Sequence, residues 1–444
     1  MREMRDSGVP WIGDMPKEWM VCRIKHVLMP GKDGIKIGPF GSSLTNKVNG
    51  EGVYKIYGQW NIVNKDFSAG KNYVSEETFE ELRNYMVYTG DVLISMMGTI
   101  GKCAIIPCDI QPGIMDSHVI KARLDKSLFI DRYFERVFDK DNSSIVYEQM
   151  QKGKKGSIMD GLNSSIVKNL IIPFPSIDEQ QRIADFLDAK CAELDTILDN
   201  TRASIEDYKA LKLSVITEAV TKGIRGERPM KDSGVEWIGE IPEEWRMSRV
   251  GLHFSIILGK MLCSEPLDES YSLEKYFCAA DVHFSGVSFD GLKTMWFSPT
   301  EKTLYKVFNG DLLVVEGGAG AGGAAIASGV TEDIFIQNSI MIVRPMAHNS
   351  GTYLKYLLES LVGRGYVDFA CNKATIPHFT KDKLGQVPFS LPSTVEQQEI
   401  AAYLDEKCAA IDSLIASKEA LITELEAYKK SLIYEYVTGK KEVL

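Results

Sequence analysis

The sequence predicts an α+β protein made of two halves related by a pseudo-twofold axis, each a globular mixed α/β domain followed by a long helix. Three observations carry this prediction: a repeated opening segment, a repeated helical tail, and two divergent middle segments that share a strand-and-turn skeleton. The chain has 444 residues, of which 44% are hydrophobic and 25% charged. That length and composition suit a soluble protein with more than one core.

Composition also excludes several classes of protein. No apolar run approaches the roughly 18 residues of a membrane-spanning helix, and no apolar stretch follows the charged N-terminus, so we expect a cytoplasmic protein without a signal peptide. The eight cysteines form no CxxC pair and no zinc-binding spacing, which predicts reduced thiols and no metal site. A formal net charge of −10 argues against a chain that grips nucleic acid unaided.

The opening segment occurs twice. Residues 4–19 read MRDSGVPWIGDMPKEW and residues 230–245 read MKDSGVEWIGEIPEEW. Agreement at most positions, including both tryptophans, indicates a duplicated architecture.

The tails also repeat, since residues 175–195 match 392–412. Their apolar residues recur with heptad spacing for about five heptads, which predicts two long helices with a/d seams. Asp178 and either Ser393 or Thr394 are the expected N-caps, and Gly223 and Gly439 the expected ends. We expect the helices to pair as an antiparallel coiled coil rather than to pack separately, each on its own domain.

Lys212 and Lys429 occupy equivalent seam positions in the two helices. Two interpretations stay open: the side chains snorkel at the seam edge, which we favour, or they control the register of the pair.

The middle segments share only a skeleton of short strands, with Gly90-Asp91-Val-Leu-Ile matching Gly310-Asp311-Leu-Leu-Val. Residues 20–172 contain 20 Lys/Arg against 17 Asp/Glu, and residues 246–394 contain 13 against 14. The excess of acidic residues therefore lies mostly outside the two middle segments. The middle segments themselves are close to neutral, so a polyanion would not be repelled by them. Divergent middles on a repeated frame indicate two different ligands presented by one scaffold.

These patterns divide the chain into seven segments: residues 1–19, N-terminal repeat segment; 20–176, globular domain 1; 177–222, long helix 1; 223–245, linker with the repeated segment; 246–393, globular domain 2; 394–438, long helix 2; 439–444, tail.

No catalytic motif in the sequence is convincing. The segment 98–102, GTIGK, lacks the first Gly and the Ser/Thr of a phosphate-binding loop, so we expect a tight turn between strands. Asp91 and Asp311 follow glycines at strand entries, where a turn is a simpler interpretation than an acid catalyst. The chain has no Pro-Pro pair for an amino-methyltransferase motif and no nuclease-like acidic cluster. We therefore predict no catalytic residue.

Gly-, Ser- and Lys-rich loops remain, and they offer the groups that contact DNA. Lysines bind phosphate or guanine, and Asn or Gln amides read adenine. Ordinary solvated loops are the alternative interpretation for any one residue. The candidate DNA-binding residues are Lys32, Lys36, Ser42, Ser43, Gln59, Asn61, Lys154, Lys155, Lys260, Asn372, Lys373, Thr375 and His378.

These motifs together resemble the specificity subunit of type I restriction-modification systems. The matching signatures are WIGxxPxxW at the start of each half, IGPFGSSL (37–44), GDVLIS, GDLLVVEGG, GSIMDGLN (156–163), IPHFT (376–380) and the EQQxIAxxLD helix starts. The resemblance spans essentially the whole chain, in order, twice. One departure is EGGAGAGGAAI (316–326), where a charged residue is common within the Gly-rich turn; its alanines weaken a claim of DNA contact there.

The resemblance implies two target recognition domains, each reading one half of a bipartite double-stranded DNA site, with the coiled coil as spacer. It implies two docked methyltransferase subunits that bind S-adenosylmethionine, restriction subunits in the full complex, and no cofactor or catalytic activity in this chain. Two alternatives from other classes are a fused DNA methyltransferase or nuclease, and a coiled-coil interaction protein unrelated to DNA.

Overall fold

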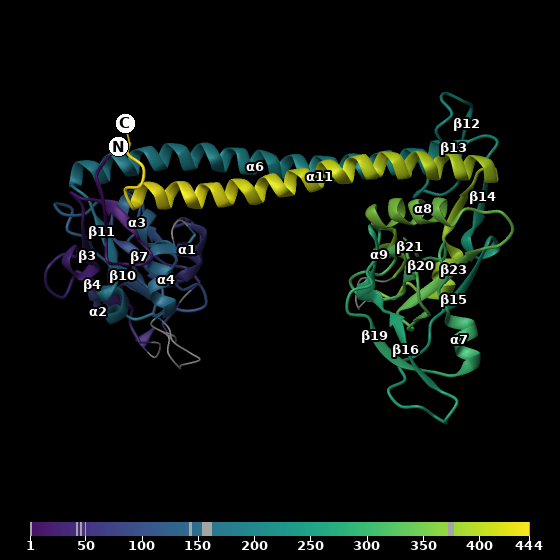
Figure 1. Ribbon diagram of the computed structural model, residues 1–444, viewed down its shortest axis with the longest axis horizontal. Coiled ribbons are helices and arrows are strands. Elements are labelled where there is room, and N and C mark those ends of the chain that lie inside the picture. The colour runs from purple at the N-terminus through teal and green to yellow at the C-terminus, as the bar shows by residue number, and fades with distance from the viewer. Residues whose placement is uncertain are drawn as a thin grey trace. The chain divides into compact units, whose positions relative to one another are not determined.

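The computed structural model describes residues 2–40, 43–44, 47–48, 50–141, 144–152, 162–371 and 377–443. Two compact units divide the chain: Met1–Thr201 with Ala420–Leu444, here called unit 1, and Arg202–Glu419, here called unit 2. The long helices α6 (Ile177–Lys222) and α11 (Thr394–Val437) each contribute one part to each unit (Figure 1). The predicted α+β class with two long helices is confirmed.

Unit 1 contains a four-stranded sheet in the order β4-β10-β7-β8 and a three-stranded sheet in the order β6-β5-β9, with the strand pairs β1-β2 and β11-β3. Its elements besides the long helices are β1 (Met4–Asp6), β2 (Asp14–Pro16), β3 (Met20–Arg23), β4 (Ile35–Ile37), β5 (Tyr54–Tyr57), α1 (Gln59–Asn64), β6 (Tyr73–Val74), α2 (Glu76–Glu81), β7 (Val92–Ser95), β8 (Cys103–Ile105), β9 (Gly113–Met115), β10 (Val119–Ala122), α3 (Asp131–Phe138), α4 (Ser144–Lys152), α5 (Ser164–Asn169) and β11 (Ile171–Phe174).

Unit 2 repeats this plan. Its four-stranded sheet has the order β15-β23-β20-β21 and its three-stranded sheet the order β19-β16-β22, with the pairs β12-β13, β14-β24 and β17-β18. Its elements are β12 (Met230–Asp232), β13 (Glu240–Pro242), β14 (Arg246–Arg249), β15 (Phe254–Leu258), β16 (Ser272–Phe277), β17 (Val282–His283), β18 (Gly286–Val287), β19 (Lys293–Phe297), α7 (Pro299–Tyr305), β20 (Leu312–Val315), β21 (Ala324–Ile326), β22 (Ile334–Ile336), β23 (Ile340–Pro345), α8 (Gly351–Gly363), α9 (Tyr366–Ala370), α10 (Lys381–Gln386) and β24 (Pro388–Leu391).

One parallel strand pair recurs in each unit. β5 pairs with β9 in parallel, with Tyr57 opposite Met115. β16 pairs with β22 in parallel, with Phe277 opposite Ile336. Because parallel strands end at the same edge, the chain segments that leave each pair emerge side by side.

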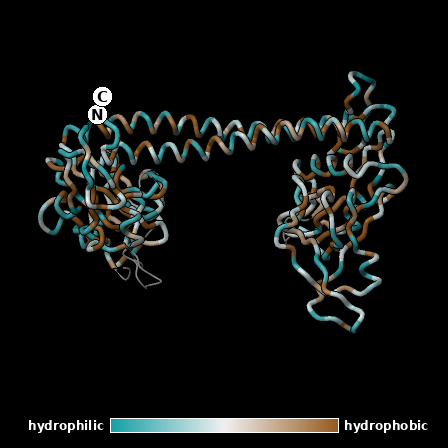
Figure 2. The backbone as a smooth tube through the Cα atoms, in the orientation of Figure 1, coloured by the Kyte–Doolittle hydropathy of each residue, from teal (hydrophilic) through white to brown (hydrophobic). Residues whose placement is uncertain are grey.

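The two long helices pack against each other within each unit. In unit 1 the core contains Leu187 and Cys191 of α6 together with Leu432 of α11. In unit 2 it contains Ile216 of α6 together with Leu404 of α11. The alternation of hydrophobic and hydrophilic residues along both helices, visible in Figure 2, supplies these seams.

The direction of the pairing is antiparallel in each unit, as predicted. In unit 1 the ring centroids of Phe186 and Tyr436 are 4.5 Å apart, and the later Asp195 contacts the earlier Lys429. In unit 2 Lys212 contacts Asp412, and Arg225, three residues after the end of α6, contacts Glu399. As residue numbers increase along α6, the residue numbers of its partners on α11 decrease, so the two helices run antiparallel within each unit.

The seam lysines form the same ion pair twice. Lys212 Nζ lies 2.7 Å from a carboxylate oxygen of Asp412, and Lys429 Nζ lies 2.5 Å from one of Asp195. The sequence repeat relates the two pairs, since both partners shift by 217 positions. Each side chain reaches across to the other helix, which favours register control over the snorkelling that the sequence favoured.

The helix ends obey local rules, with one correction. Ser393 Oγ accepts the amide hydrogen of Glu396, so Ser393 caps α11. Asp178 does not cap α6: that helix already begins at Ile177, and the carbonyl oxygen of Ser176 accepts the amide hydrogens of Glu179 and Gln180. Gly223 and Gly439 follow the helices with φ of 75° and 74°, a left-handed conformation that glycine adopts without strain.

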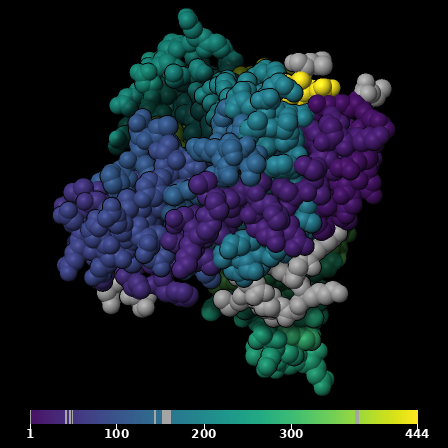
Figure 3. All heavy atoms as spheres, turned by 90° about the vertical axis from the view of Figure 1, so that its left-hand side faces the viewer, coloured from purple at the N-terminus to yellow at the C-terminus, as the bar shows by residue number. Residues whose placement is uncertain are grey.

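Each opening segment is held by a buried tryptophan. Trp19 Nε1 donates to Glu179 in the first turn of α6, at 2.8 Å, and Trp245 Nε1 donates to Glu396 in the first turn of α11, at 3.0 Å. In unit 1 the opening segment also meets the end of the chain, since Lys440 Nζ donates to the carbonyl oxygen of Ile12 at 2.6 Å. Figure 3 shows the C-terminal residues, in yellow, beside this purple segment.

All eight cysteines are free thiols. Over the described residues, no helix combines the length and the apolar character that crossing a membrane requires.

Candidate nucleic-acid interface

Four segments gather where the strands of each unit end. In unit 1 they are the loops 38–40 after β4, 96–97 after β7 and 116–118 after β9, and residues 58–61, which follow β5 and begin α1. We call this set the loop end of unit 1.

The corresponding loops of unit 2 are residues 259–261 after β15, 278–281 after β16, 316–317 after β20 and 337–339 after β22. We call this set the loop end of unit 2.

Four backbone hydrogen bonds that join these loops are the same in both units. The amide of Gly38 donates to the carbonyl of Val119 at 2.9 Å, and that of Gly259 to Ile340 at 3.0 Å. Further matched pairs join Asp116 to Tyr57 and Gln337 to Phe277, Met96 to His118 and Glu316 to Ser339, and Leu162 to Met96 and Phe379 to Glu316.

The side chains on this shared framework differ between the units. Unit 1 presents Gln59-Trp60 and Asp116-Ser117-His118, where unit 2 has Ala279-Ala280 and Gln337-Asn338-Ser339. Trp60 is 55% exposed, which leaves an aromatic face available for stacking. Carboxylate, amide, hydroxyl and imidazole groups are the donors and acceptors that distinguish base edges in a groove.

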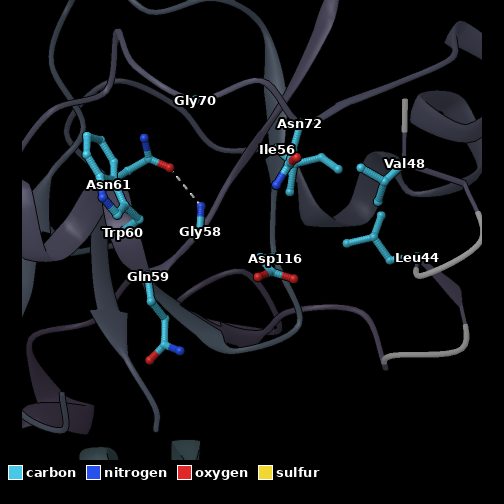
Figure 4. Close-up of a pocket in the computed structure, with 10 residues that line it drawn as sticks. All are labelled: Leu44, Val48, Ile56, Gly58, Gln59, Trp60, Asn61, Gly70, Asn72 and Asp116. Carbon is cyan, nitrogen blue, oxygen red and sulfur yellow. Dashed lines mark hydrogen bonds between the residues drawn. The ribbon is translucent and has the colours of Figure 1, made fainter. Parts of the chain in front are cut away.

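A cavity of about 420 Å³ hollows the loop end of unit 1. Figure 4 shows Asp116 between the 58–61 segment on one side and Leu44 and Val48 on the other. The residues that line the cavity are Leu44, Val48, Ile56, Gly58, Gln59, Trp60, Asn61, Gly70, Asn72 and Asp116. Asp116 is the one charged residue among them, so this hollow can accept a hydrogen bond from an exocyclic amine of a base.

A buried ion pair braces the sheet behind each loop end. Arg123 Nε lies 2.7 Å from Asp91 Oδ1, and Asp91 Oδ2 accepts the amide hydrogen of Tyr88 at 2.9 Å. In unit 2 the same bonds join Arg344 to Asp311, and Asp311 to the amide of Phe308. The Gly-Asp pairs are therefore strand-entry turns, as the sequence favoured, and the glycine-rich segment 98–102 lies in the turn between antiparallel β7 and β8.

Unit 1 buries a lysine where unit 2 has an isoleucine. Lys121 on β10 is 4% exposed and donates to the carbonyl oxygen of Met86, whereas Ile342 holds the matching place on β23. Burial lowers the pKa of Lys121 to about 8.

The predicted contact residues of unit 1 fall in different places. Gln59 belongs to the loop end, where its Oε1 accepts the amide hydrogen of Met97 at 3.1 Å, and exposed Ser43 bonds back to Phe40. Lys32 is exposed but precedes β4, at the other end of that strand from Gly38. Lys36 Nζ donates to the carbonyl of Asn84 at 3.0 Å.

Asn61 needs correction as a base reader. It is 4% exposed; its Oδ1 accepts the amide hydrogen of Gly58, and its Nδ2 donates to the carbonyls of Asp66 and Ala69. With both amide hydrogens used by the fold, its side chain shapes the loop rather than offering donors to DNA.

In unit 2 Lys260 needs the same correction and His378 does not. Lys260 is 9% exposed and pairs with Glu301, so its charge is neutralised inside the unit. The exposed His378 lies at the loop end, with Nδ1 3.3 Å from Glu316 Oε2. The remaining candidates, Ser42, Lys154, Lys155, Asn372, Lys373 and Thr375, lie outside the described residues.

Several residues of the loop ends were not predicted, among them Phe40, Asp116, His118, Met261, Gln337 and Asn338. A usable signal was present. Residues 115–119 read MDSHV and residues 336–340 read IQNSI, so three polar residues stand between apolar strand positions in both halves.

Among the residues that the structure describes, no group of three or more acidic, cysteine or histidine side chains is arranged to hold a metal ion.

Comparison with known proteins places this frame in a family. The family model of the type I restriction modification DNA specificity domain matches residues 16–207 and again residues 242–427. The MjaX specificity subunit of Methanocaldococcus jannaschii, described as a putative type I restriction enzyme subunit, is 24% identical over 442 residues, covering 97% of this chain and 96% of the relative. The EcoBI specificity subunit of Escherichia coli is 24% identical over 377 residues, covering 80% and 74%.

Solved structures share the fold. A chain from a type I R-M system, solved in work on complex assembly and conformational transition, matches with a TM-score of 0.71 and 18% identity, covering 96% of this chain and 99% of that one. The HsdS subunit from Thermoanaerobacter tengcongensis matches with a TM-score of 0.54 and 18% identity, covering 96% and 98%. With two copies of the specificity domain spanning most of its length, the chain belongs to the DNA specificity subunits of type I restriction-modification systems.

Proposed function

We propose that this chain is the non-catalytic, DNA-reading subunit of its restriction-modification complex, in which each loop end reads one half of a bipartite target. The observation that supports this most strongly is the pair of loop ends, which keep one backbone framework and differ in their exposed side chains. A framework repeated for identical partners and varied for different ligands is what reading two unlike half-sites requires.

A domain exchange tests this proposal. Residues 20–172 are replaced by the corresponding segment of another recognition domain, and methylated bases are mapped across the genome of cells carrying either version. One half of the methylated motif is expected to change while the other half stays. A change in both halves, or in neither, contradicts the assignment of one half-site to each unit.

The long helices set the gap between the half-sites in this proposal. Supporting it, each helix contributes to both units, and the Lys–Asp pairs hold its register at equivalent points. Inserting one heptad after Thr201 and one before Ala420 lengthens each helix by about 10 Å. The gap in the methylated motif is expected to widen by about three base pairs, with both half-motifs unchanged. An unaltered gap would contradict the proposal that the long helices set the distance between the half-sites.

Partner docking is proposed on a duplicated apolar surface of the coiled coil. In unit 1 the exposed apolar residues are Ile197 of α6 with Leu421 and Tyr428 of α11. In unit 2 they are Leu211 of α6 and Leu414 of α11, apart from Val395 in the first turn of α11. The repeat of 217 positions relates Ile197 to Leu414 and Leu211 to Tyr428, so each unit offers a copy of one patch, which suits two identical methyltransferase subunits.

Acidic substitutions in this patch test the docking proposal. Leu421→Asp with Tyr428→Asp is expected to remove one methyltransferase subunit from the complex, and Leu211→Asp with Leu414→Asp the other, as measured by native mass spectrometry. The matched controls are Ala427→Asp and Ala416→Asp, at neighbouring exposed positions. Two bound subunits in every variant would place docking elsewhere.

Catalysis is assigned to the partners, which would bind S-adenosylmethionine, and translocating restriction subunits would complete the assembly. Isothermal titration of the purified chain with S-adenosylmethionine is expected to give no binding heat. Saturable binding would contradict the non-catalytic assignment and favour a fused methyltransferase.

A further inference from the structure

In each loop end, the loop that leaves the first strand of the four-stranded sheet carries a large apolar side chain that projects into solvent. Phe40 is 88% exposed and Met261 is 75% exposed. Phe40 has the highest exposure of the large apolar side chains in the described part of the chain. Water contact with so much apolar surface is unfavourable, so a large side chain kept this exposed is a candidate for burial against a ligand.

The two side chains occupy the same place in the two units. Each is the third residue after the strand that opens its sheet, since β4 ends at Ile37 and β15 ends at Leu258. In both loops the pattern is a buried glycine, a buried second residue and an exposed apolar third residue. Chance placement of one exposed apolar residue does not explain two at matched positions.

Close backbone packing holds each loop against the polar segment beside it. A Cβ added at Gly38 would overlap the carbonyl oxygen of Asp116, and one added at Gly259 would overlap that of Gln337. Only glycine permits this approach. The apolar tip is thereby fixed next to the 116–118 segment in unit 1 and the 337–339 segment in unit 2.

The second residue of each loop is immobilised by different chemistry. Pro39 is buried, and its ring restricts φ. Lys260 pairs with Glu301 and lies 4.9 Å from the ring centroid of Tyr271. The second residue is held by a proline ring in one unit and by an ion pair in the other, yet both units fix the apolar third residue in the same exposed place. This indicates that the exposed apolar side chain is the feature that both units require.

We propose that Phe40 and Met261 each insert between two base pairs of their half-site, unstacking one base step and anchoring the unit on DNA. This inference rests on the proposed function, that the loop ends bind DNA. Phe and Met are among the side chains that proteins use as wedges between base steps. The neighbouring polar segments could then read the edges of the bases that flank the opened step.

The test uses the complete complex of this chain with its methyltransferase subunits. Duplexes carry the motif established by methylated-base mapping, with 2-aminopurine placed singly at each purine of each half-site. Binding is expected to raise fluorescence at one step per half-site, in addition to any signal at the methylated adenine. Phe40→Ala is expected to abolish the signal in the first half only and Met261→Ala in the second half only, each with about tenfold weaker binding.

Matched variants separate insertion from other effects. Phe40→Leu and Met261→Leu are expected to retain the signals, because a wedge of similar size remains. Val53→Ala and Leu252→Ala remove exposed apolar side chains that precede β5 and β15, before the strands rather than in the loops that leave them, and are expected to change nothing.

Two results would overturn the inference. In the first, Phe40→Ala and Met261→Ala keep the wild-type affinity and fluorescence. In the second, they weaken binding without changing the fluorescence, which would mean contact in a groove rather than insertion. Failure of the wild-type complex to bind its mapped motif specifically would contradict the proposed function instead, so the two failures are distinguishable.

Discussion

The loop ends of unit 1 and unit 2 share four backbone hydrogen bonds between their loops and present different side chains. Gly38 and Gly259, for example, make the same bond and the same close approach, yet the polar segments beside them are Asp-Ser-His in one unit and Gln-Asn-Ser in the other. The comparison teaches that folding constrains the backbone and a few buried side chains here. The exposed side chains are left free to change with the ligand.

The shared framework is expected to respond most strongly where the opening segments meet the long helices. Trp19→Ala and Trp245→Ala should each lower the free energy of unfolding of their own unit by about 4 kcal/mol, since each removes a buried indole and its hydrogen bond to a buried glutamate. Urea denaturation with hydrogen exchange resolved by unit measures this. Trp60→Ala, at an exposed site, is the control; a large effect in one unit alone would break the equivalence.

The second-largest loss of stability is expected at the Asp–Arg ion pairs that hold the sheet behind each loop end. Asp91→Asn and Asp311→Asn should each cost about 3 kcal/mol, because each takes the partner from a mostly buried arginine. Thermal unfolding of the two variants should give similar losses. Asp33→Asn, at an exposed position, should leave stability near that of the wild type, and unequal losses would show that the two braces are not alike.

The buried Lys121 of unit 1 has no counterpart in unit 2, and we expect the free energy of unfolding to depend on pH because of it. Its folded-state pKa of about 8 lies below the usual value of 10.5. Between those values the unfolded chain binds the proton that the folded chain does not, so the folded state gains stability as pH rises. The stability of Lys121→Ile relative to wild type should therefore fall by roughly 2 kcal/mol from pH 7 to pH 10.

Paired urea titrations at the two pH values measure this change. Ile342→Val in unit 2 is the control, since it alters the matching strand position without a titratable group. A difference between Lys121→Ile and wild type that stays constant with pH would contradict the assigned burial of charge.

The smallest expected effect concerns the helix register. Lys212→Glu should cost about 0.5 kcal/mol, and adding Asp412→Lys should restore most of it, because the Asp side chain is half exposed and solvent screens the pair. Lys429 with Asp195 should behave in the same way. Double-mutant cycles measure both couplings, with Lys430→Glu as an exposed control; zero coupling in both would leave snorkelling as the better interpretation.

The fold was largely predictable because its signals are periodic and repeated. Heptads and two copies of one opening segment indicated the helices, their antiparallel pairing and the duplicated plan, and the Gly-Asp pairs marked strand entries. The cap at Asp178 was misplaced by two positions, a scale at which neighbouring polar residues compete for the same role.

The interface was less predictable because residue type does not reveal burial. Asn61 and Lys260 have side chains that could contact DNA, but the amide of Asn61 is hydrogen-bonded at the start of α1 and the ammonium of Lys260 is held in a buried ion pair. Asp116 and Gln59 come together through the parallel pairing of β5 with β9, which no local pattern announces. Phe40 was overlooked because an apolar residue is ordinarily assigned to a core.

The composition of the two units determines when each can form during synthesis. Unit 2 is a continuous stretch, Arg202–Glu419, whereas unit 1 joins Met1–Thr201 to Ala420–Leu444. The hydroxyl of Tyr133 donates to the carbonyl of Val437, and Arg2 pairs with Glu442. In a nascent chain leaving the ribosome, unit 2 can therefore be completed first, while unit 1 waits for residues 420–444 to be translated.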